Sequence, residues 1–467
     1  MATPNTHYGA AAIAQMLDGA RHIHFIGVGG VMMSSLALIT RERGYVVSGT
    51  DRTRTAVTES LQESGISVHY EHSADAARGA DMVVYTVAIS PDNPEYAYAK
   101  AEGIPCVSRA DYLGYIMMGY VHRVGIAGMH GKSTCTSMCA QIFVGADADP
   151  TVLSGAATAC LGGAYRIGGK THFIFEACEY MDSFLDFNPS IAVLLNVEME
   201  HVDYFGSMEQ IRTSFGKYAD LTGESGFAVA NCDDPEVMAS LGAYLGGTVT
   251  FGIENEYATF RAVNLTYENG YPVFDILLDG EHFAHISLSV PGKHNVYNAL
   301  AAAASAHLCG ISAEDIASGL HAFCGAGRRM EYKGKLNGAA VYDDYGHHPT
   351  EVTATLQGMS RMGFERIFCV FQPHTYSRTV QLADRFAGAF GDADRVILVD
   401  IYAAREKDSK GISSAKLASR IGAKAAYQPD LQKVSEMLCT EVTARDAVVV
   451  MGAGDVYRLF ALLPLEK

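Results

Sequence analysis

With 467 residues, the chain is too long for one hydrophobic core, and its length predicts about three domains. Hydrophobic residues make up 49% and charged residues 19% of the sequence, which excludes a disordered chain, and the net charge of −17 opposes binding to nucleic acids and anionic membranes. Ten cysteines without a C-x-x-C pair argue against disulfides and structural zinc, and the absence of a signal peptide and of a membrane-spanning run predicts a cytoplasmic protein.

The first 120 residues have the pattern of a Rossmann-like domain. The expected elements are strands at 22–27, 45–49 and 82–88 and a helix at 31–43. A glycine-rich turn at 27–30 joins the first strand to the helix, and Asp51 follows the second strand, as in a nucleotide-binding β-α-β unit. Met32 replaces the third glycine of a G-x-G-x-x-G turn and is expected to crowd the helix against the strand, which disfavours a dinucleotide.

The segment 125–134, Gly-Ile-Ala-Gly-Met-His-Gly-Lys-Ser-Thr, is the most informative part of the sequence. It follows an apolar run and precedes small residues that favour a helix, so it predicts a phosphate-binding turn at a helix N-terminus. The backbone around Gly128 and Gly131 would bind phosphate oxygens. Lys132 would reach the β- and γ-phosphates, and the Ser133 hydroxyl would bind Mg²⁺. The standard P-loop has a further glycine where this chain has isoleucine, so a glycine-rich turn with a chance lysine stays open.

Two further α/β units follow this loop. The expected elements are strands at 173–175, 191–196, 339–343, 366–371, 395–399 and 447–451, helices at 298–308 and 313–323, and an antiparallel meander between 246 and 291. Asn-Gly at 269–270 and Asp-Gly at 279–280 are the expected turns of the meander. The glycine- and arginine-rich segment 325–329 is interpreted as a hinge. The expected domains are therefore 1–120, 121–326 and 327–467.

Polar residues that follow buried strands indicate a divalent metal site beside the loop. Glu176 comes directly after one strand, and His201 follows the next. Ligands gather at the carboxyl ends of parallel strands, so we expect both residues to lie with Ser133 as a ligand set for Mg²⁺. Histidine is an unusual partner of Mg²⁺. The alternatives are that Glu176 caps a helix and that His201 is satisfied within its own loop.

Two clusters in the last third of the chain combine acids, imidazoles and arginine. Residues 342–350, Tyr-Asp-Asp-Tyr-Gly-His-His-Pro-Thr, follow a strand. Asp344 would act on a metal or an amine, and His347 or His348 would take a proton or bind a carboxylate. The alternative is a polar helix N-terminus with proline in its first turn. The Arg378 guanidinium would bind a carboxylate through two parallel N–H groups. The alternative is a surface arginine whose charge is neutralised by one of the many acidic residues. Together with the set around Glu176 and His201, these two clusters predict one cleft that closes by domain motion.

Together these motifs resemble those of the Mur ligase family over nearly the whole chain. The matching segments are 27–30, 48–51, 128–134, 176–180, 196–204, 291–295, 327–329, 342–349 and 372–379. The resemblance implies an α/β protein of three domains: an N-terminal Rossmann-like domain for a UDP-sugar, a central P-loop-type ATPase domain with a small antiparallel meander, and a C-terminal Rossmann-like domain. Met129 and Ser133 stand where the family usually has threonine, and only Ser133 keeps the hydroxyl.

The resemblance implies ATP-dependent amide formation through an acyl phosphate. The lactyl carboxylate of UDP-N-acetylmuramate would attack the γ-phosphate, and the amine of L-alanine would then displace phosphate. By motif position, ATP would contact Gly128, Met129, His130, Gly131, Lys132, Ser133, Thr134, His294, Asn295 and Arg329, and Mg²⁺ would be held by Ser133, Glu176 and His201. The UDP-sugar would contact Gly29, Gly30 and Asp51, L-alanine would contact Tyr345, His347, His348 and Arg378, and Lys132, Asp344, His347 and Arg378 would carry catalysis.

Three other functions stay open at this point. A murein peptide ligase would attach a recycled tripeptide to the same sugar nucleotide, although residues 372–379 and 400–404 favour alanine. An NAD-dependent oxidoreductase would use the turn at 27–30 but leaves the loop at 125–134 unexplained. A nucleotide sensor without catalysis would use the same loop as a switch. We expect a monomer or weak homodimer, with no nucleic-acid partner and no membrane insertion.

Overall fold

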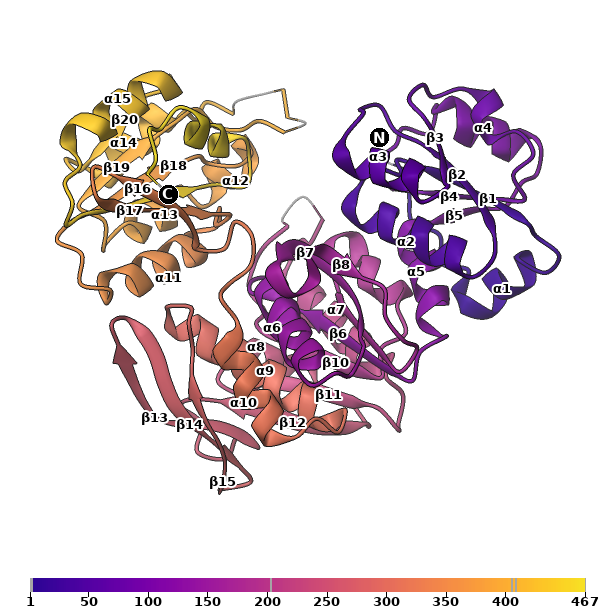
Figure 1. The fold of residues 1–467 in the computed structure, drawn as a ribbon, viewed down its shortest axis with the longest axis horizontal. Coiled ribbons are helices and arrows are strands. Elements are labelled where there is room, and N and C mark those ends of the chain that lie inside the picture. Colours follow the sequence, from indigo (N-terminus) through magenta and orange to yellow (C-terminus); the bar gives the residue numbers. More distant parts are fainter. Residues whose placement is uncertain (1–2, 202–203, 405, 408–409, 467) are drawn as a thin grey trace. The chain divides into compact units, whose positions relative to one another are not determined.

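The computed structural model describes residues 3–201, 204–404, 406–407 and 410–466 (Figure 1). The chain divides into two compact units, residues 1–251 with 301–311 and residues 252–300 with 312–467. Both units are α/β structures built on largely parallel sheets, as predicted. Within the described residues, no helix has both the length and the apolar character that crossing a bilayer requires. The domain limits at 120 and 326 stay predictions.

The N-terminal sheet is parallel and has the strand order β3-β2-β1-β4-β5. Its elements are β1 (His22–Ile26), β2 (Val46–Thr50), β3 (Ser67–His69), β4 (Met82–Tyr85), β5 (Cys106–Ser108), α1 (Gly9–Met16), α2 (Val31–Glu42), α3 (Ala56–Glu63), α4 (Pro94–Ala101) and α5 (Arg109–Met117). Every residue of β1 after His22 is buried, because strands of a parallel sheet are covered on both faces. The three predicted strands and the predicted helix are confirmed, although β4 ends at Tyr85.

The central sheet of the first unit has the strand order β8-β7-β9-β6-β10-β11-β12 and is parallel except for the β7–β8 pair. Its elements are β6 (His122–Ala127), β7 (Thr151–Thr158), β8 (Gly163–Arg166), β9 (His172–Glu176), β10 (Ile191–Leu194), β11 (Phe227–Asn231), β12 (Gly247–Gly252), α6 (Lys132–Gly145), α7 (Met208–Asp220) and α8 (Pro235–Ser240). Ile126 of β6 pairs with Glu176 of β9 and with Val193 of β10. The loops that follow these three strands therefore open at the same edge of the sheet.

The antiparallel meander belongs to the second unit and consists of β13 (Phe260–Glu268), β14 (Tyr271–Leu278) and β15 (Glu281–Ser287). Its two predicted turns are confirmed: φ is 51° and 88° at 269–270 and 50° and 87° at 279–280, as type I′ turns require. The prediction that the meander begins near 246 is wrong, because β12 pairs in parallel with β11. Helix α9 (Lys293–Leu308) begins five residues earlier than predicted, and α10 (Ala313–Ala322) lies where expected.

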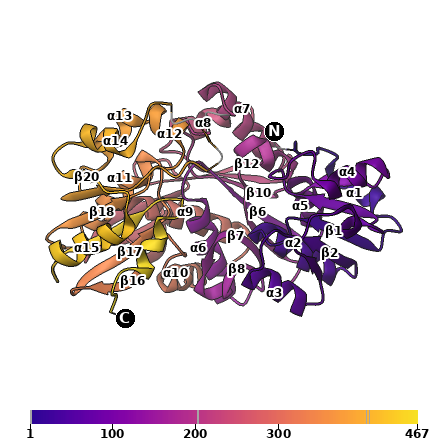
Figure 2. The same cartoon turned by 90° about the horizontal axis from the view of Figure 1, so that it is seen from above.

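The C-terminal sheet has the order β16-β17-β21-β18-β19-β20 and is parallel except for the β16–β17 pair. Its elements are β16 (Glu331–Leu336), β17 (Ala339–Asp344), β18 (Ile367–Phe371), β19 (Arg395–Leu398), β20 (Ala425–Tyr427), β21 (Ala447–Met451), α11 (Pro349–Ser360), α12 (Tyr376–Gln381), α13 (Ala383–Ala389), α14 (Ser414–Ile421), α15 (Leu431–Glu441) and the 3₁₀ helix η4 (Val456–Ala461). Helices α11, α13 and α14 pack on one face, and α15 and η4 pack on the other. Figure 2 shows α13 and α14 on one side of these strands and α15 on the other. All four predicted strands are confirmed.

The outer strand β16 is paired on its free side by residues near the end of the chain. The backbone N–H of Lys335 donates to the carbonyl oxygen of Glu466, and the N–H of Glu466 donates to the carbonyl oxygen of Lys335, both at 2.8 Å. Gly334 permits this approach, since a Cβ there would lie 2.5 Å from the Glu466 carbonyl oxygen. Part of an exposed edge, which would otherwise offer free hydrogen-bonding groups, is thereby covered.

Candidate active site

The phosphate-binding loop predicted from the sequence is the turn between β6 and α6. Gly128 has a φ of 146°, and Gly131, the residue before α6, has a φ of 86°, which side-chain-bearing residues rarely adopt. A Cβ on Gly128 would lie 2.9 Å from the Cβ of Leu195, so only glycine lets the loop approach the end of β10. No described side chain caps the N-terminus of α6, and its first N–H groups suit an anion.

Lys132 is the first residue of α6, and its ammonium group lies inside this loop. Its Nζ donates to the carbonyl oxygens of Gly128 and Met129, at 2.5 and 3.2 Å, and to Glu179 Oε2 at 3.0 Å. Burial acts to lower the pKa of Lys132, but the charge and hydrogen bond of Glu179, together with the nearby Cys178 and Glu176, raise the pKa above its ordinary value. The lysine is therefore a cation where a phosphate is expected.

Glu179 links Lys132 to His201. The Nε2 of His201 lies 3.1 Å from Glu179 Oε1, and the Glu179 side chain has no exposure to solvent. Burial alone would raise the pKa of Glu179, but the charge of Lys132 and the hydrogen bond to His201 hold it below its ordinary value. The sequence alone gave Glu179 no role beyond its place in the segment 176–180. Its only signal was its place three residues after Glu176.

Glu176 is the last residue of β9, and its carboxylate reaches the neighbouring strand β7. Glu176 Oε1 accepts hydrogen bonds from the Ser154 hydroxyl, at 3.3 Å, and from the backbone N–H of Gly155. The charge of Glu176 also contributes to the raised pKa of Lys132. The structure thus gathers Glu176, Glu179 and His201 around the lysine that directly precedes Ser133. A hydroxyl and a carboxylate are ligand types that Mg²⁺ prefers, so these residues fit the ion.

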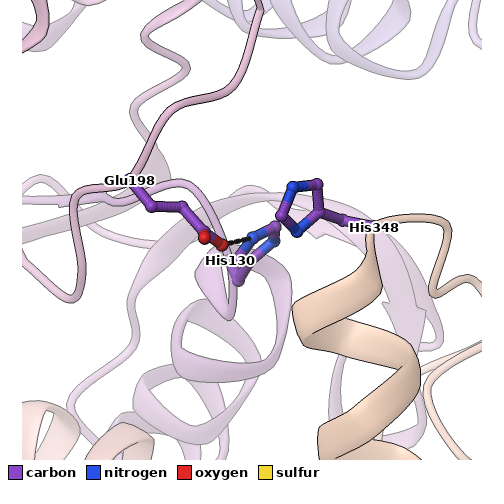
Figure 3. Close-up of side chains that lie close together, drawn as sticks. All are labelled: His130, Glu198 and His348. Carbon is purple, nitrogen blue, oxygen red and sulfur yellow. Dashed lines mark hydrogen bonds and ion pairs between the residues drawn. The ribbon is translucent and has the colours of Figure 1, made fainter. Parts of the chain in front are cut away.

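His130 is fixed to the segment after β10. The backbone N–H of His130 donates to Asn196 Oδ1 at 2.8 Å, and Asn196 Nδ2 donates back to the His130 carbonyl oxygen at 2.9 Å. The His130 ring nitrogen Nε2 lies 2.5 Å from Glu198 Oε1 (Figure 3). These contacts hold the tip of the loop. The sequence assigned no role to Asn196 or Glu198, because only the pairing of β6 with β10 brings them to His130.

In the N-terminal sheet, the structure brings Gly29 and Asp51 together, and their contact with a UDP-sugar stays a prediction. The backbone N–H of Gly29 donates to Asp51 Oδ2 at 3.0 Å, and the N–H of Thr53 donates to Oδ1 at 3.1 Å. A Cβ on Gly29 would lie 2.8 Å from Asp51 Oδ2, so the contact requires glycine. Gly30 is the residue before α2, and Met32 is half-buried at the border of the core.

In the second unit, Asp344 ends β17 and is almost fully buried. Its Oδ2 accepts a hydrogen bond from the backbone N–H of Met330 at 2.9 Å, and its Oδ1 accepts one from Gly346 at 2.7 Å. Burial raises the pKa of Asp344 to about 6, although the charge of Arg329 and the two N–H groups oppose this rise. A carboxyl with such a pKa exchanges protons near neutrality.

His347 and His348 have different surroundings. His348 is fully buried, and its Nδ1 accepts a hydrogen bond from Thr350 at the start of α11, which confirms the predicted helix N-terminus. Glu351 Oε2 accepts from the backbone N–H of both histidines, at 2.8 and 3.1 Å. The His347 side chain keeps 20% exposure, and its ring lies 5.6 Å from that of His374. His347 is therefore the more accessible imidazole.

The two predicted arginines lie against rings. The guanidinium carbon of Arg329 lies 4.8 Å from the centre of the Tyr345 ring, within the range of a cation–π contact. The Nη1 of Arg378 lies 3.1 Å from the Nδ1 of His374. The structure thus clusters the predicted residues of 342–350 and 372–379 through His347 and His374.

His294 and Asn295 lie in the first turn of α9. Asn295 Nδ2 donates to the carbonyl oxygen of Pro291 at 2.7 Å, and its Oδ1 accepts from Asn298 at 3.0 Å. Burial lowers the pKa of His294 to about 4, so its imidazole is neutral. The contacts of Asn295 explain why α9 begins earlier than the alanine-rich run predicts. Contact of both residues with adenine stays a prediction.

Three family models match the chain. They are described as "Mur ligase family, catalytic domain" over residues 22–121, "Mur ligase middle domain" over 126–306, and "Mur ligase, glutamate ligase domain" over 328–454. A UDP-N-acetylmuramate–L-alanine ligase from Acetivibrio thermocellus is 44% identical over 451 residues, which is 96% of each chain. Another from Caldanaerobacter subterraneus is 43% identical over 447 residues, 95% of this chain and 97% of that one.

Solved structures show the same fold. A UDP-N-acetylmuramate–alanine ligase from Thermotoga maritima superposes with a TM-score of 0.78 at 28% identity, over 94% of this chain and 97% of that one. A murein peptide ligase from Psychrobacter arcticus gives 0.72 at 24% identity, over 96% and 100%, which shows a shared fold alone. From the three matched models and the relatives that align along nearly its whole length, the chain belongs to the Mur ligase family.

Proposed function

We propose that the protein is an ATP-dependent ligase that joins L-alanine to the lactyl carboxylate of UDP-N-acetylmuramate. Relatives that carry this activity in their names align with 96% and 95% of the chain. The structural observation that carries the proposal is the glycine loop at 128–131 with the protonated Lys132 held against Glu179. A preorganised cation beside free helix N–H groups suits the stabilisation of phosphoryl charge.

In the proposed reaction, the carboxylate of the sugar attacks the γ-phosphorus of ATP, and ADP leaves. Two anions must meet in this step, so positive charge has to be in place before they do. Lys132 supplies this charge, and Glu179 keeps the ammonium group at one position. The N–H groups of the loop and of the first turn of α6 bind phosphate oxygens.

We infer that Ser133, Glu176 and His201 hold Mg²⁺. The inference is supported by the gathering of Glu176 and His201 around Lys132 and by the hard oxygen donors of the serine and the glutamate. When bound, the ion supplies further neutralisation of the phosphate charge. The hydrogen bonds that Glu176 accepts from Ser154 and Gly155 fix the orientation of its carboxylate.

The second step joins the amino acid. The amine of L-alanine attacks the carbonyl carbon of the acyl phosphate, inorganic phosphate leaves, and the nitrogen loses a proton. Asp344 and His347 are our candidates for accepting this proton, since the pKa of Asp344 is raised to about 6 and His347 keeps an accessible ring. We assign Arg378 to the carboxylate of alanine because its guanidinium offers a fork. Closure of the C-terminal part over the loop stays a prediction.

Phosphate release in the presence of ATP, Mg²⁺ and UDP-N-acetylmuramate tests the proposal. We expect release to depend on L-alanine and the product mass to grow by one alanine residue. Turnover with the recycled tripeptide alone would assign a murein peptide ligase instead. ATP binding without amino-acid-stimulated hydrolysis would assign a nucleotide sensor, and a change in nicotinamide absorbance with a 2-hydroxy acid would assign an oxidoreductase. The cytoplasmic location and the monomeric or weakly dimeric state stay predictions.

A further inference from the structure

A pocket of ≈870 Å³ lies in the C-terminal part of the second unit, on the sheet face covered by α15 and η4. Its lining comes from Arg328, Glu331, Lys333, Asp343 and Leu431 and from residues 457–458 and 460–462. The volume is within the range of small-molecule sites, roughly 300–1,000 Å³. None of the residues that we assign to ATP, the sugar or alanine lines it. We call it the η4 pocket.

Asp343 places a buried acceptor in the η4 pocket. Successive side chains of a strand point to opposite faces, so Asp343 faces α15 and η4 while Asp344 faces the other way. Asp343 is 3% exposed, and its Oδ1 has no hydrogen-bond partner among the described residues. Its Oδ2 lies 3.4 Å from the Nε of Arg328. A buried oxygen without a donor is costly, so this site favours a ligand that supplies one.

Most of the Arg328 guanidinium is already engaged by the protein, although its buried Nε has no hydrogen-bond partner among the described residues. Its Nη2 donates to the carbonyl oxygen of Gly452 at 2.6 Å. Its guanidinium carbon lies 5.1 Å from the ring centres of both Tyr345 and Tyr457. Arg328 therefore forms part of the wall, and the donor for Asp343 Oδ1 has to come from elsewhere.

The outer part of the η4 pocket is positive. The Arg458 side chain is 69% exposed, and that of Lys333 is 31% exposed, with Lys333 Nζ 3.0 Å from Glu331 Oε1. Three cations and two acids line the pocket, a net charge of +1, from Arg328, Lys333 and Arg458 against Glu331 and Asp343. This balance suits one carboxylate better than a multiply charged phosphate. Leu431, Phe460 and Leu462 supply the apolar part of the lining.

We propose that the η4 pocket binds a small zwitterion with an apolar body, an amino acid or a short peptide. The ammonium group of the ligand donates to Asp343, and its carboxylate binds Lys333 and Arg458. Charge-assisted hydrogen bonds of this kind are stronger than neutral ones and fix the direction of the ligand. The proposal does not depend on the ligase reaction, since binding requires neither ATP nor the sugar nucleotide.

Calorimetric titration of the full chain with L-alanyl-L-phenylalanine at millimolar concentration tests this proposal. We expect the dipeptide to bind, and we expect its N-acetyl and C-terminal amide derivatives to bind about tenfold more weakly, because each lacks one charge. Absence of dipeptide binding, or equal binding of all three compounds, overturns the proposal.

Variants locate the bound dipeptide. Asp343→Asn removes the charge at nearly constant volume, and Ala461→Trp, at an exposed position, narrows the mouth without touching the buried acid. Both should weaken binding about tenfold, as should Arg458→Ala. Arg420→Ala is the matched control, since Arg420 pairs with the exposed Asp384 outside the pocket, and it should leave binding unchanged.

Two outcomes of the variant series contradict the proposal. Dipeptide binding that survives Ala461→Trp and Arg458→Ala is not in the η4 pocket. Binding that is lost in Arg378→Ala and kept in Ala461→Trp places the dipeptide in the proposed alanine site. If Asp343→Asn does not fold, which circular dichroism shows, Ala461→Trp and Arg458→Ala decide.

Discussion

Glu179 accepts a hydrogen bond from the ammonium group of Lys132 at 3.0 Å, and it does so without any exposure to solvent. Removing one partner of a buried ion pair leaves the other charge uncompensated. The pair therefore fixes the ammonium group of Lys132 at the turn between β6 and α6. The geometry of this turn depends on Glu179, which lies in a different part of the sequence.

Lys132→Ala should reduce ATP-dependent phosphate release by about a hundredfold or more, because the loop loses the cation that we assign to the phosphates of ATP. The fold should still form, since Glu179 keeps His201 as a partner, although the loss of its buried counter-charge should lower stability. Phosphate release and circular dichroism measure the two effects. Lys170→Ala, at an exposed lysine of the same unit, is the control. ADP production by Lys132→Ala at the unmodified rate would refute the assignment.

Glu179→Gln should destabilise the protein by about 3 kcal/mol, because the buried ammonium of Lys132 loses its counter-charge. The pKa of Glu179 is held low in the folded state, so its contribution is present above the ordinary pKa of glutamate and is lost as pH falls through the lower folded value. The difference in unfolding free energy between the two proteins should therefore shrink in acid. Urea titrations at several pH values measure it, with exposed Glu224→Gln as the control. A difference that grows in acid would contradict the argument.

For Asp344→Asn, the difference in unfolding free energy from the unmodified protein should depend on pH in the opposite sense to that of Glu179→Gln. Burial raises the pKa of Asp344 to about 6, so its stabilising contribution is complete below the unfolded value and is lost as pH rises through about 6. A shift of this size corresponds to about 3 kcal/mol. The stability of the variant relative to the unmodified protein should thus rise between pH 4 and pH 7. Denaturant midpoints across that range measure it, and a flat difference would show that Asp344 ionises normally.

The two meander turns should tolerate alanine differently. A Cβ on Gly270 would lie 2.6 Å from the Cγ of Met362, whereas a Cβ on Gly280 meets nothing within 4 Å. Both glycines have positive φ, so each substitution costs about 1–2 kcal/mol of backbone strain. Gly270→Ala should cost about 1–3 kcal/mol more because of the contact. Equal unfolding free energies for the two variants would contradict the packing described around Gly270.

The glycine turn between β6 and α6 was predictable from the sequence because the residues that form it are local; its binding of phosphate stays a prediction. Gly128 and Gly131 are needed for positive φ, and Lys132 follows directly, so the residues that act together are neighbours in the chain. Glu179 was not predictable as the partner of Lys132. The turn that positions it continues through Met181 and Asp182, both with left-handed φ, a conformation that aspartate tolerates but that residue propensities do not anticipate for methionine.

The consecutive acids Asp343 and Asp344 show a second limit of the sequence. The pattern placed both after an apolar strand, but which acid faces which side depends on how β17 pairs with β16 and β21. Likewise, the residues of β12 were assigned to the meander because short alternating segments broken by Asn-Gly and Asp-Gly turns were expected between 246 and 291, whereas pairing with β11 makes β12 part of the parallel sheet. Strand pairing over long sequence distances is the information that residue patterns do not contain.

The backbone bridge between Lys335 and Glu466 has a practical consequence for anyone preparing the protein. Glu466 is hydrogen-bonded to the edge strand β16. A fusion partner joined after Glu466 through a short linker would strain these two hydrogen bonds. Removing Glu466 and its neighbours would expose the backbone N–H and C=O groups of β16. Strands of neighbouring molecules can then pair with this edge, and the protein would precipitate when it is concentrated.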